Sequence, residues 1–268
     1  MYLTVNGAPT FCYTGGKPFD AAKPTVVFIH GVLNDHSVWI LQTRYFAHHG
    51  WNVLALDLPG HCKSGGEAPR TVQEAAAFTL ALLDAAGVKK AALVGHSFGS
   101  LTALEAAAMA PERVTHLALV GTAFPMKVTP ALLDNSLNDP MKAIAMVNMF
   151  QHSMLAPPPS ALGPGTWLYG GAKALMKRVL ASNSKVNVFH RGFKACDDYR
   201  GGEVAMDKVK CPVLFILGNS DYMTLPKMAH PLIAKSPQSK VVLLEAGHQL
   251  MTEAPDGVLF ALKDFLKV

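Results

Sequence analysis

The chain has 268 residues, of which 50% are hydrophobic, and it carries four cysteines and a formal net charge of +5. This length suits one large domain or a core domain with an insertion, and no apolar segment reaches the about 18 residues of a membrane span. The basic residues are scattered, which argues against nucleic acid as a partner. The cysteines form no C-x-x-C pair, so neither a zinc site nor a disulfide framework is predicted. Because no signal peptide is visible at the start, we expect a soluble cytoplasmic protein.

The chain begins with a predicted hairpin, in which Asn6-Gly7 supplies the positive φ angles of a tight turn. Beyond it, short apolar runs alternate with helical segments, as in a parallel sheet whose strands are buried on both faces. The predicted strands are 25–29, 52–56, 91–94, 114–120, 212–217 and 240–244. The predicted helices are 38–49, 71–86, 100–110, 226–234 and 254–266. This alternation predicts an α/β fold with a doubly wound, mostly parallel sheet.

The alternation is interrupted once, by helical segments that proline and glycine break up. We expect a helical cap of residues 123–206, inserted into a core of residues 1–122 and 207–268. Half of the twelve methionines lie between residues 126 and 176 of this segment. Because methionine is flexible and polarizable, a methionine-rich helical surface adapts to apolar ligands. Three of these residues are therefore predicted to bind substrate, although core packing explains them equally well: Met126, Met146 and Met149.

The most informative motif is Gly95-His96-Ser97-Phe98-Gly99, which lies between an apolar run and a helical segment. A serine hydroxyl is a weak nucleophile and needs exposure, a base and hydrogen-bond donors for the oxyanion. A tight strand-to-helix turn supplies the exposure, and flanking glycines let neighbouring backbone pass without a clash. Ser97 is therefore the predicted nucleophile. The Phe98 N–H, at the start of the next helix, is a predicted oxyanion donor.

The predicted acid, Asp221, follows the predicted strand 212–217, and the predicted base, His248, follows the predicted strand 240–244. Loops at the carboxyl ends of parallel strands gather at one edge of a sheet, where ligands bind. Ser97, Asp221 and His248 are therefore expected to form a triad, in which His248 moves the serine proton and Asp221 orients the imidazole. Asp57 also follows a strand, but the Leu-Pro-Gly that comes next indicates a turn anchor. The neighbouring His96 is predicted to be structural.

A second oxyanion donor is predicted after the strand 25–29, where His30-Gly31 precedes Val32. A glycine just past a strand lets backbone approach a substrate closely, so the Val32 N–H is the predicted donor. His30 itself is predicted to anchor the loop through hydrogen bonds.

Together these motifs resemble those of the α/β-hydrolase fold superfamily, in particular its capped serine hydrolases, over essentially the whole chain. The resemblance rests on His30-Gly31, Asp57-Leu58-Pro59-Gly60-His61 with Ser64, residues 95–99, Asp221, and Gly247-His248. Cys62 stands where such proteins often have glycine. The resemblance implies a hydrolase, and a serine nucleophile disfavours haloalkane dehalogenases and epoxide hydrolases. We expect a carboxylesterase that acts on small to medium apolar esters without cofactor or metal.

Three other functions stay open at this point. A carbon–carbon bond hydrolase of ring-cleavage diketones would need polar groups from the cap, such as Arg178, Arg191 and Lys173. A cofactor-free perhydrolase, of the non-haem haloperoxidase kind, shares the triad. A ligand-binding protein on a hydrolase scaffold is disfavoured, since binding alone does not need the base. The sequence determines neither the substrate nor whether the protein is a monomer or a homodimer.

Overall fold

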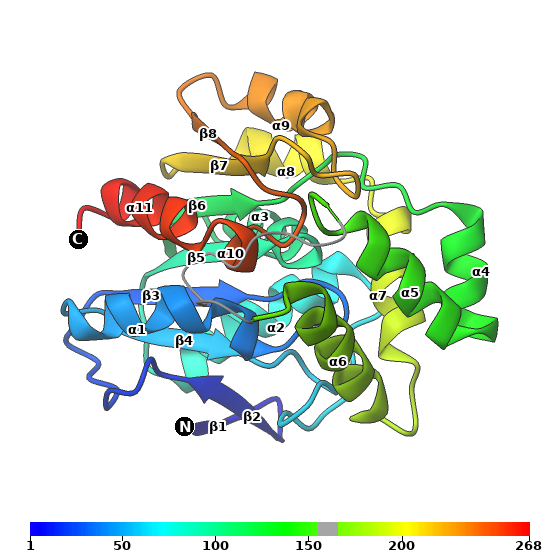
Figure 1. The fold of residues 1–268 in the computed structure, drawn as a ribbon. Helices are drawn as coiled ribbons and strands as arrows, with labels where there is room; N and C mark the ends of the chain where they lie inside the picture. Colours follow the sequence, from blue (N-terminus) through cyan, green and yellow to red (C-terminus); the bar gives the residue numbers. More distant parts are fainter. Residues whose placement is uncertain (155–165) are drawn as a thin grey trace.

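The structure, a computed structural model, describes residues 1–154 and 166–268 and contains an eight-stranded sheet between two layers of helices (Figure 1). The strand order is β1-β2-β4-β3-β5-β6-β7-β8, with β1 and β2 antiparallel to their neighbours and the other pairs parallel. The strands are β1 (Tyr2–Val5), β2 (Ala8–Tyr13), β3 (Thr25–Ile29), β4 (Asn52–Leu56), β5 (Ala91–His96), β6 (Val114–Val120), β7 (Val213–Gly218) and β8 (Lys240–Leu244). The predicted fold class is thus confirmed.

The first two strands form the predicted hairpin. Asn6 and Gly7 adopt φ angles of 49° and 78°, as a two-residue turn of this kind requires. β2 then pairs with β4 and adds an antiparallel edge to the parallel sheet.

Side chains of the parallel strands alternate between two cores, because successive residues of a strand point to opposite faces. Val27 and Ile29 of β3 enter the core beneath α2, α3, α8 and α9. Val26 and Phe28 enter the other core, beneath α1, α10 and α11. The helices of these layers are α1 (Ile40–His48), α2 (Val72–Ala85), α3 (Phe98–Met109), α8 (Gly202–Lys208), α9 (His230–Lys235), α10 (Leu250–Glu253) and α11 (Pro255–Leu266), with short 3-10 turns at His36–Trp39 and Pro226–Ala229.

Four further helices lie beyond one end of the sheet (Figure 1). They are α4 (Pro130–Asn138), α5 (Pro140–Phe150), α6 (Leu168–Ala181) and α7 (Val188–Asp198). Ile144, Val179 and Phe189 from three of them share an apolar cluster with Leu33, which follows β3. This cluster fixes the helices over the carboxyl ends of the strands. None of the described helices is long and apolar enough to cross a membrane.

The expected boundary of the inserted segment at residue 206 lies within α8. This helix packs against α3 and α9, which belong to the layers that cover the sheet. From the end of α8 at Lys208, the chain leads directly into β7.

The inserted helices begin with clear capping signals. Thr129 precedes α4 and accepts a hydrogen bond from the Leu132 N–H, and Asp139 precedes α5 and accepts one from the Lys142 N–H. Each cap is followed by a proline, which suits the first turn because its missing N–H has no helical partner there. The second cap and proline explain why α4 and α5 are separate helices.

Candidate active site

Ser97 occupies the turn between β5 and α3, with φ 54° and ψ −120°. Positive φ is strained for a residue other than glycine, and such strain is typical of functional sites. A Cβ on Gly95 would lie 2.0 Å from the Gly99 carbonyl oxygen, and one on Gly99 would lie 2.3 Å from the Ile29 carbonyl oxygen. Only glycine therefore fits at either side of this turn, and Ser97 itself remains half-buried rather than enclosed.

Asp221 and His248 follow β7 and β8, at the same end of the sheet as Ser97. His248 Nδ1 lies 2.8 Å from Asp221 Oδ2, and both side chains are buried. Asp221 Oδ1 accepts hydrogen bonds from the backbone N–H groups of Met223 and Thr224, each at 2.8 Å. The Thr224 hydroxyl donates to Oδ2 at 2.7 Å. These donors fix which carboxylate oxygen faces the imidazole.

The environment of Asp221 favours its charged form. Burial raises the pKa of this carboxyl, but the charge and hydrogen bond of His248 and the donors of Thr224 lower it further. The pKa therefore lies below its ordinary value, and the group is ionised at neutral pH. An ionised carboxylate at this distance can orient the imidazole and stabilise the imidazolium that forms when His248 takes a proton.

His96 supports the backbone of His248. Its Nε2 lies 2.9 Å from the His248 carbonyl oxygen, and the two rings are 4.6 Å apart. Burial, together with the nearby His248, lowers the pKa of His96 to about 3. His96 is therefore neutral, and the nitrogen that faces the carbonyl carries the proton. This agrees with the structural role expected for His96.

Ser97, His248 and Thr224 line a cavity of about 190 Å³ between the sheet edge and the inserted helices. Most of its other side chains are apolar: Met126, Val128, Leu132, Met146, Phe150, Phe193 and Met223. The volume is below the about 300 Å³ at which sites for drug-sized ligands begin. The described cavity therefore suits a small apolar group next to the serine.

Two of the three methionines predicted to bind substrate line this cavity. Met126 follows β6, and Met146 lies on α5. Met149 does not line it, and 54% of its surface is exposed. Phe150, four positions after Met146, shares its face of α5 more closely than Met149, which is three positions after it. Phe150 therefore stands beside Met146 on the cavity wall. The spacing from Met146 was the signal in the sequence that could have found Phe150.

The turn after β3 approaches Ser97 closely. A Cβ on Gly31 would lie 3.0 Å from Ser97 Cβ. His30 Nε2 accepts the Leu58 N–H at 3.1 Å, so Nδ1 carries the proton and donates to the Gly31 carbonyl at 2.8 Å. His30 therefore anchors this loop, as expected, and directs the Gly31 carbonyl toward its own ring. Phe98, the other residue expected to supply an oxyanion donor, begins α3, where backbone N–H groups have no helical partner.

The inserted helix α7 contacts the same turn. A Cβ on Gly192 would lie 3.0 Å from Val32 Cγ2, so glycine makes room for Val32. Val32 is half-buried beneath α7. Helix α7 therefore packs against the loop whose Val32 N–H is the expected second oxyanion donor.

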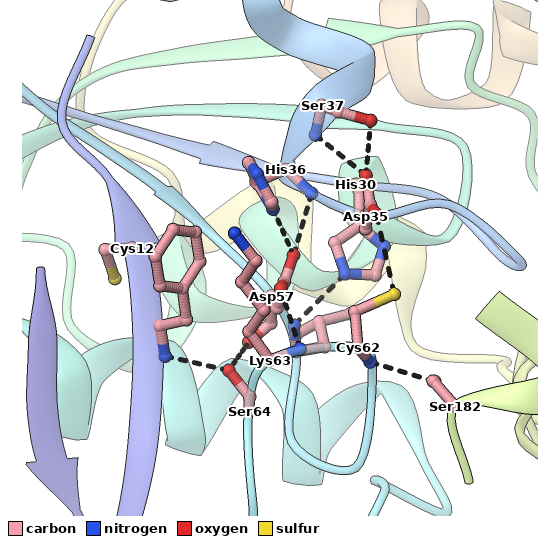
Figure 2. Close-up of polar contacts among 12 residues, drawn as sticks. Cys12, His30, Asp35, His36, Ser37, Asp57, Cys62, Lys63, Ser64 and Ser182 are labelled. Atoms are coloured by element: carbon pink, nitrogen blue, oxygen red, sulfur yellow. Dashed lines mark hydrogen bonds and ion pairs between the residues drawn. The ribbon is translucent and has the colours of Figure 1, made fainter. Parts of the chain in front are cut away.

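Asp57 lies in the polar cluster that Figure 2 shows, and it is not among the residues that line the cavity. Its Oδ1 accepts from the backbone N–H and from ring Nδ1 of His36, at 2.9 and 2.7 Å. Its Oδ2 accepts from the Lys63 N–H at 3.1 Å. Asp57 is therefore a turn anchor, as the sequence indicated, and does not compete with Asp221.

The same cluster brings Asp35, His36 and Asp57 close enough together to hold a metal ion. Asp35, however, already accepts hydrogen bonds from Ser37 and from Arg178, the latter at 2.7 Å. Protein donors thus satisfy both carboxylates, and Arg178 supplies the positive charge that a metal would bring. The donor set fits a structural network better than a metal centre.

Cys62 belongs to this network (Figure 2). Its φ of 44° lies in the region that favours glycine. Glycine is often the residue at this position in the family that this chain resembles. Burial and the nearby charges of Asp35 and Asp57 raise the pKa of the Cys62 thiol to about 12. The side chain is therefore an uncharged thiol at neutral pH.

The cap cations considered for a carbon–carbon hydrolase do not line the described cavity. Arg178 bonds Asp35, and Arg191 donates to the Ala68 carbonyl at 2.8 Å. Lys173 is exposed on α6.

Comparison with known proteins identifies relatives of this chain. Residues 24–151 match a family model described as the alpha/beta hydrolase fold. A dihydrolipoyllysine-residue acetyltransferase component of the acetoin cleaving system from Cupriavidus necator is 40% identical over 97 residues, or 36% of this chain and 26% of that protein. The match thus spans about a quarter of that relative's length.

Other relatives match nearly the whole chain. A pimeloyl-(acyl-carrier protein) methyl ester esterase from Neisseria meningitidis serogroup B is 28% identical over 255 residues, which cover 92% of this chain and 94% of that protein. The crystal structure of the enol-lactonase from Burkholderia xenovorans LB400 superposes with a TM-score of 0.83 over 100% of both chains, at 22% identity. At that identity the likeness establishes the fold.

Proposed function

We propose that this chain is a serine hydrolase of the α/β-hydrolase fold superfamily, which cleaves carboxylic esters through an acyl-enzyme on Ser97. One observation carries the proposal: His248, whose Nδ1 lies 2.8 Å from Asp221 Oδ2, lines the same apolar cavity as Ser97 at its strained turn. A serine, an imidazole and a carboxylate at one edge of the sheet support the proposal, because acyl transfer of this kind uses a nucleophile, a base and an orienting acid.

In the proposed reaction, His248 Nε2 takes the proton of the Ser97 hydroxyl as its oxygen attacks the ester carbonyl carbon. The backbone N–H groups of Val32 and Phe98 stabilise the oxyanion of the tetrahedral intermediate. His248 then returns the proton to the leaving alkoxide, which departs as the alcohol. Water, deprotonated by His248, then attacks the carbonyl carbon of the acyl-enzyme. The bond to Ser97 Oγ breaks, His248 returns the proton to this oxygen, and the carboxylic acid is released. Asp221 stays ionised throughout and stabilises the imidazolium.

The proposed substrates are esters with a small to medium apolar acyl or alcohol group. The apolar walls of the cavity and its modest volume support this class. The names of one relative and of one structural neighbour support the same bond type, since the first is a methyl ester esterase and the second is an enol-lactonase.

The test compares Ser97→Ala with the wild type on p-nitrophenyl acetate and butyrate. We expect kcat to fall about 10⁴-fold or more, because loss of the nucleophile removes the covalent route. Ser184→Ala, at an exposed serine before α7, is the control and should keep full activity. Undiminished turnover by Ser97→Ala would refute the proposal.

The alternatives are separated on the same preparation. Loss of absorbance of a vinylogous diketone acid would indicate a carbon–carbon hydrolase, although Arg178 and Arg191 make other contacts in this structure. Bromination that depends on peroxide would indicate a perhydrolase. A protein that hydrolyses none of these substrates, and whose Ser97 resists a fluorophosphonate, would be a binding protein.

A further inference from the structure

A buried chain of three amide side chains joins α5 to the loop that carries His248. Gln249 Nε2 donates to Gln151 Oε1 at 2.7 Å, and Gln151 Nε2 donates to Asn148 Oδ1 at 2.7 Å. Asn148 Nδ2 in turn donates to the backbone carbonyl of Tyr169 in α6, at 3.0 Å. The side chains are at most 5% exposed. We call Asn148, Gln151 and Gln249 the amide chain.

The hydrogen bonds of the amide chain can run in only one direction. The Tyr169 carbonyl only accepts, so Asn148 must present its amide nitrogen there and its oxygen to Gln151. The same reasoning then orients Gln151 toward Gln249. Because an unpaired buried amide is costly, each member of the amide chain holds the next in place.

Backbone contacts reinforce this connection on both sides of His248. The Gln249 N–H donates to the Gln151 carbonyl at 3.1 Å. A Cβ on Gly247 would lie 2.5 Å from the Ser153 nitrogen and 2.7 Å from the His152 carbonyl carbon. Both neighbours of His248 therefore pack against residues 151–153, at the end of α5.

The other contacts that hold His248 come from the core. Its ring bonds Asp221, and its carbonyl oxygen lies against His96. The inserted segment reaches His248 through the amide chain and residues 151–153, and α5 also carries Met146 and Phe150 on the cavity wall. One helix thus contacts both the space for substrate and the loop of the expected base.

We propose that Gln151 and Gln249 are positioning residues, which hold the His248 loop in register with Ser97 from the inserted helix α5. The inference rests on the proposed function of Ser97 and His248. Their role would be geometric, since neither side chain lines the described cavity. A displacement of about 1 Å in a catalytic group can cost about 100-fold in rate, so a tether next to the base matters for turnover.

The test uses Gln151→Met and Gln249→Met, which keep an unbranched side chain of similar length and remove the amide. On p-nitrophenyl butyrate we expect kcat to fall about tenfold or more, with KM within about twofold of the wild type. The second-order rate of labelling by a fluorophosphonate should fall in parallel, because that reaction also needs the base. Rates are expressed per active site by titration, so that unfolded protein does not count.

A matched control is available at the far end of the sheet. Asn52 begins β4 and is 3% exposed, and its side chain bonds backbone groups of Asp20 and Lys23. Asn52→Leu removes a buried amide with its hydrogen bonds, as the glutamine variants do. We expect it to lower the melting temperature while kcat per active site stays at the wild-type value.

The double variant Gln151→Met/Gln249→Met separates positioning from stability. It removes both partners of one hydrogen bond, so its melting temperature should fall by less than the sum of the two single losses. Its kcat should nevertheless stay low. The inference is overturned if the glutamine variants behave like Asn52→Leu, with full kcat per active site. That result would leave the proposed function intact, whereas full activity of Ser97→Ala would remove the basis of both.

Discussion

Replacing Asp221 by asparagine tests the role assigned to the carboxylate, since the structure dictates how the new amide must sit. Asp221 Oδ1 accepts two backbone N–H groups, from Met223 and Thr224, each at 2.8 Å. An amide nitrogen cannot accept them, so the amide oxygen must take this place. The amide nitrogen then occupies the place of Oδ2, 2.8 Å from His248 Nδ1.

This orientation reverses the tautomer of His248. The amide nitrogen donates, so Nδ1 must accept and the proton moves to Nε2, which can no longer take the serine proton. The variant also removes the charge that stabilises the imidazolium. Together these effects are expected to lower kcat about 10⁴-fold, or about 5 kcal/mol of transition-state stabilisation.

The assay is steady-state hydrolysis of p-nitrophenyl butyrate by Asp221→Asn, with thermal unfolding as a check on the fold. Thr224→Val is the companion variant, because it keeps the carboxylate and removes the hydroxyl that donates to Oδ2 and lies 3.1 Å from His248 Nδ1. Its kcat should fall by about tenfold, the worth of one hydrogen bond. A folded Asp221→Asn variant that kept more than about a tenth of the wild-type kcat would contradict the role assigned to Asp221.

Three further predictions follow from the site and its surroundings. Gly31→Ala should lower kcat/KM for p-nitrophenyl butyrate about tenfold or more, because the new Cβ would lie 3.0 Å from Ser97 Cβ. A wild-type kcat/KM would contradict this prediction. Met146→Phe should disfavour octanoate against acetate esters by about tenfold, which a chain-length panel measures; an unchanged profile would exclude Met146 from the acyl site. Burial lowers the pKa of His96 to about 3 and of His61 to about 4, so the unfolded chain binds protons below about pH 6.5 that the folded chain does not. Stability should therefore be complete above that pH and fall by about 2 kcal/mol per histidine by pH 5, which urea unfolding at pH 7 and 5 checks; equal midpoints would count against it.

Much of the sheet was predictable, because its parallel strands are buried on both faces and read as continuous apolar runs. The bounds of β3, β4, β6 and β8 agree with the predicted runs, whereas β5 extends two residues further, to His96. The sequence could not show that β5 runs up to the nucleophile turn, since His96 is polar and its burial depends on contacts with the His248 loop.

The inserted helices were harder to interpret, because helical periodicity does not say which face meets a cavity. Met146 and Met149 carried the same sequence signal, yet only Met146 lines the cavity and Phe150 takes the neighbouring place. The helix α8 was missed because it is short and begins at the second of two adjacent glycines, Gly201 and Gly202. Packing against α3 and α9 stabilises this helix.

The amide chain had no signal in the sequence. Gln151 and Gln249 are 98 residues apart, and their hydrogen bond exists only because α5 ends beside the loop after β8. A pattern of residue types along the chain identifies elements and motifs, whereas a contact of this kind depends on tertiary packing.

The most direct test of the account is the site of covalent modification by a fluorophosphonate. Peptide mass spectrometry should find one phosphonyl group per chain, on Ser97, and its extent should match the loss of esterase activity at every time point. Excess p-nitrophenyl butyrate should slow the modification of Ser97 and the loss of esterase activity equally. Complete inactivation with an unmodified Ser97, or full modification of Ser97 with esterase activity retained, would contradict the account.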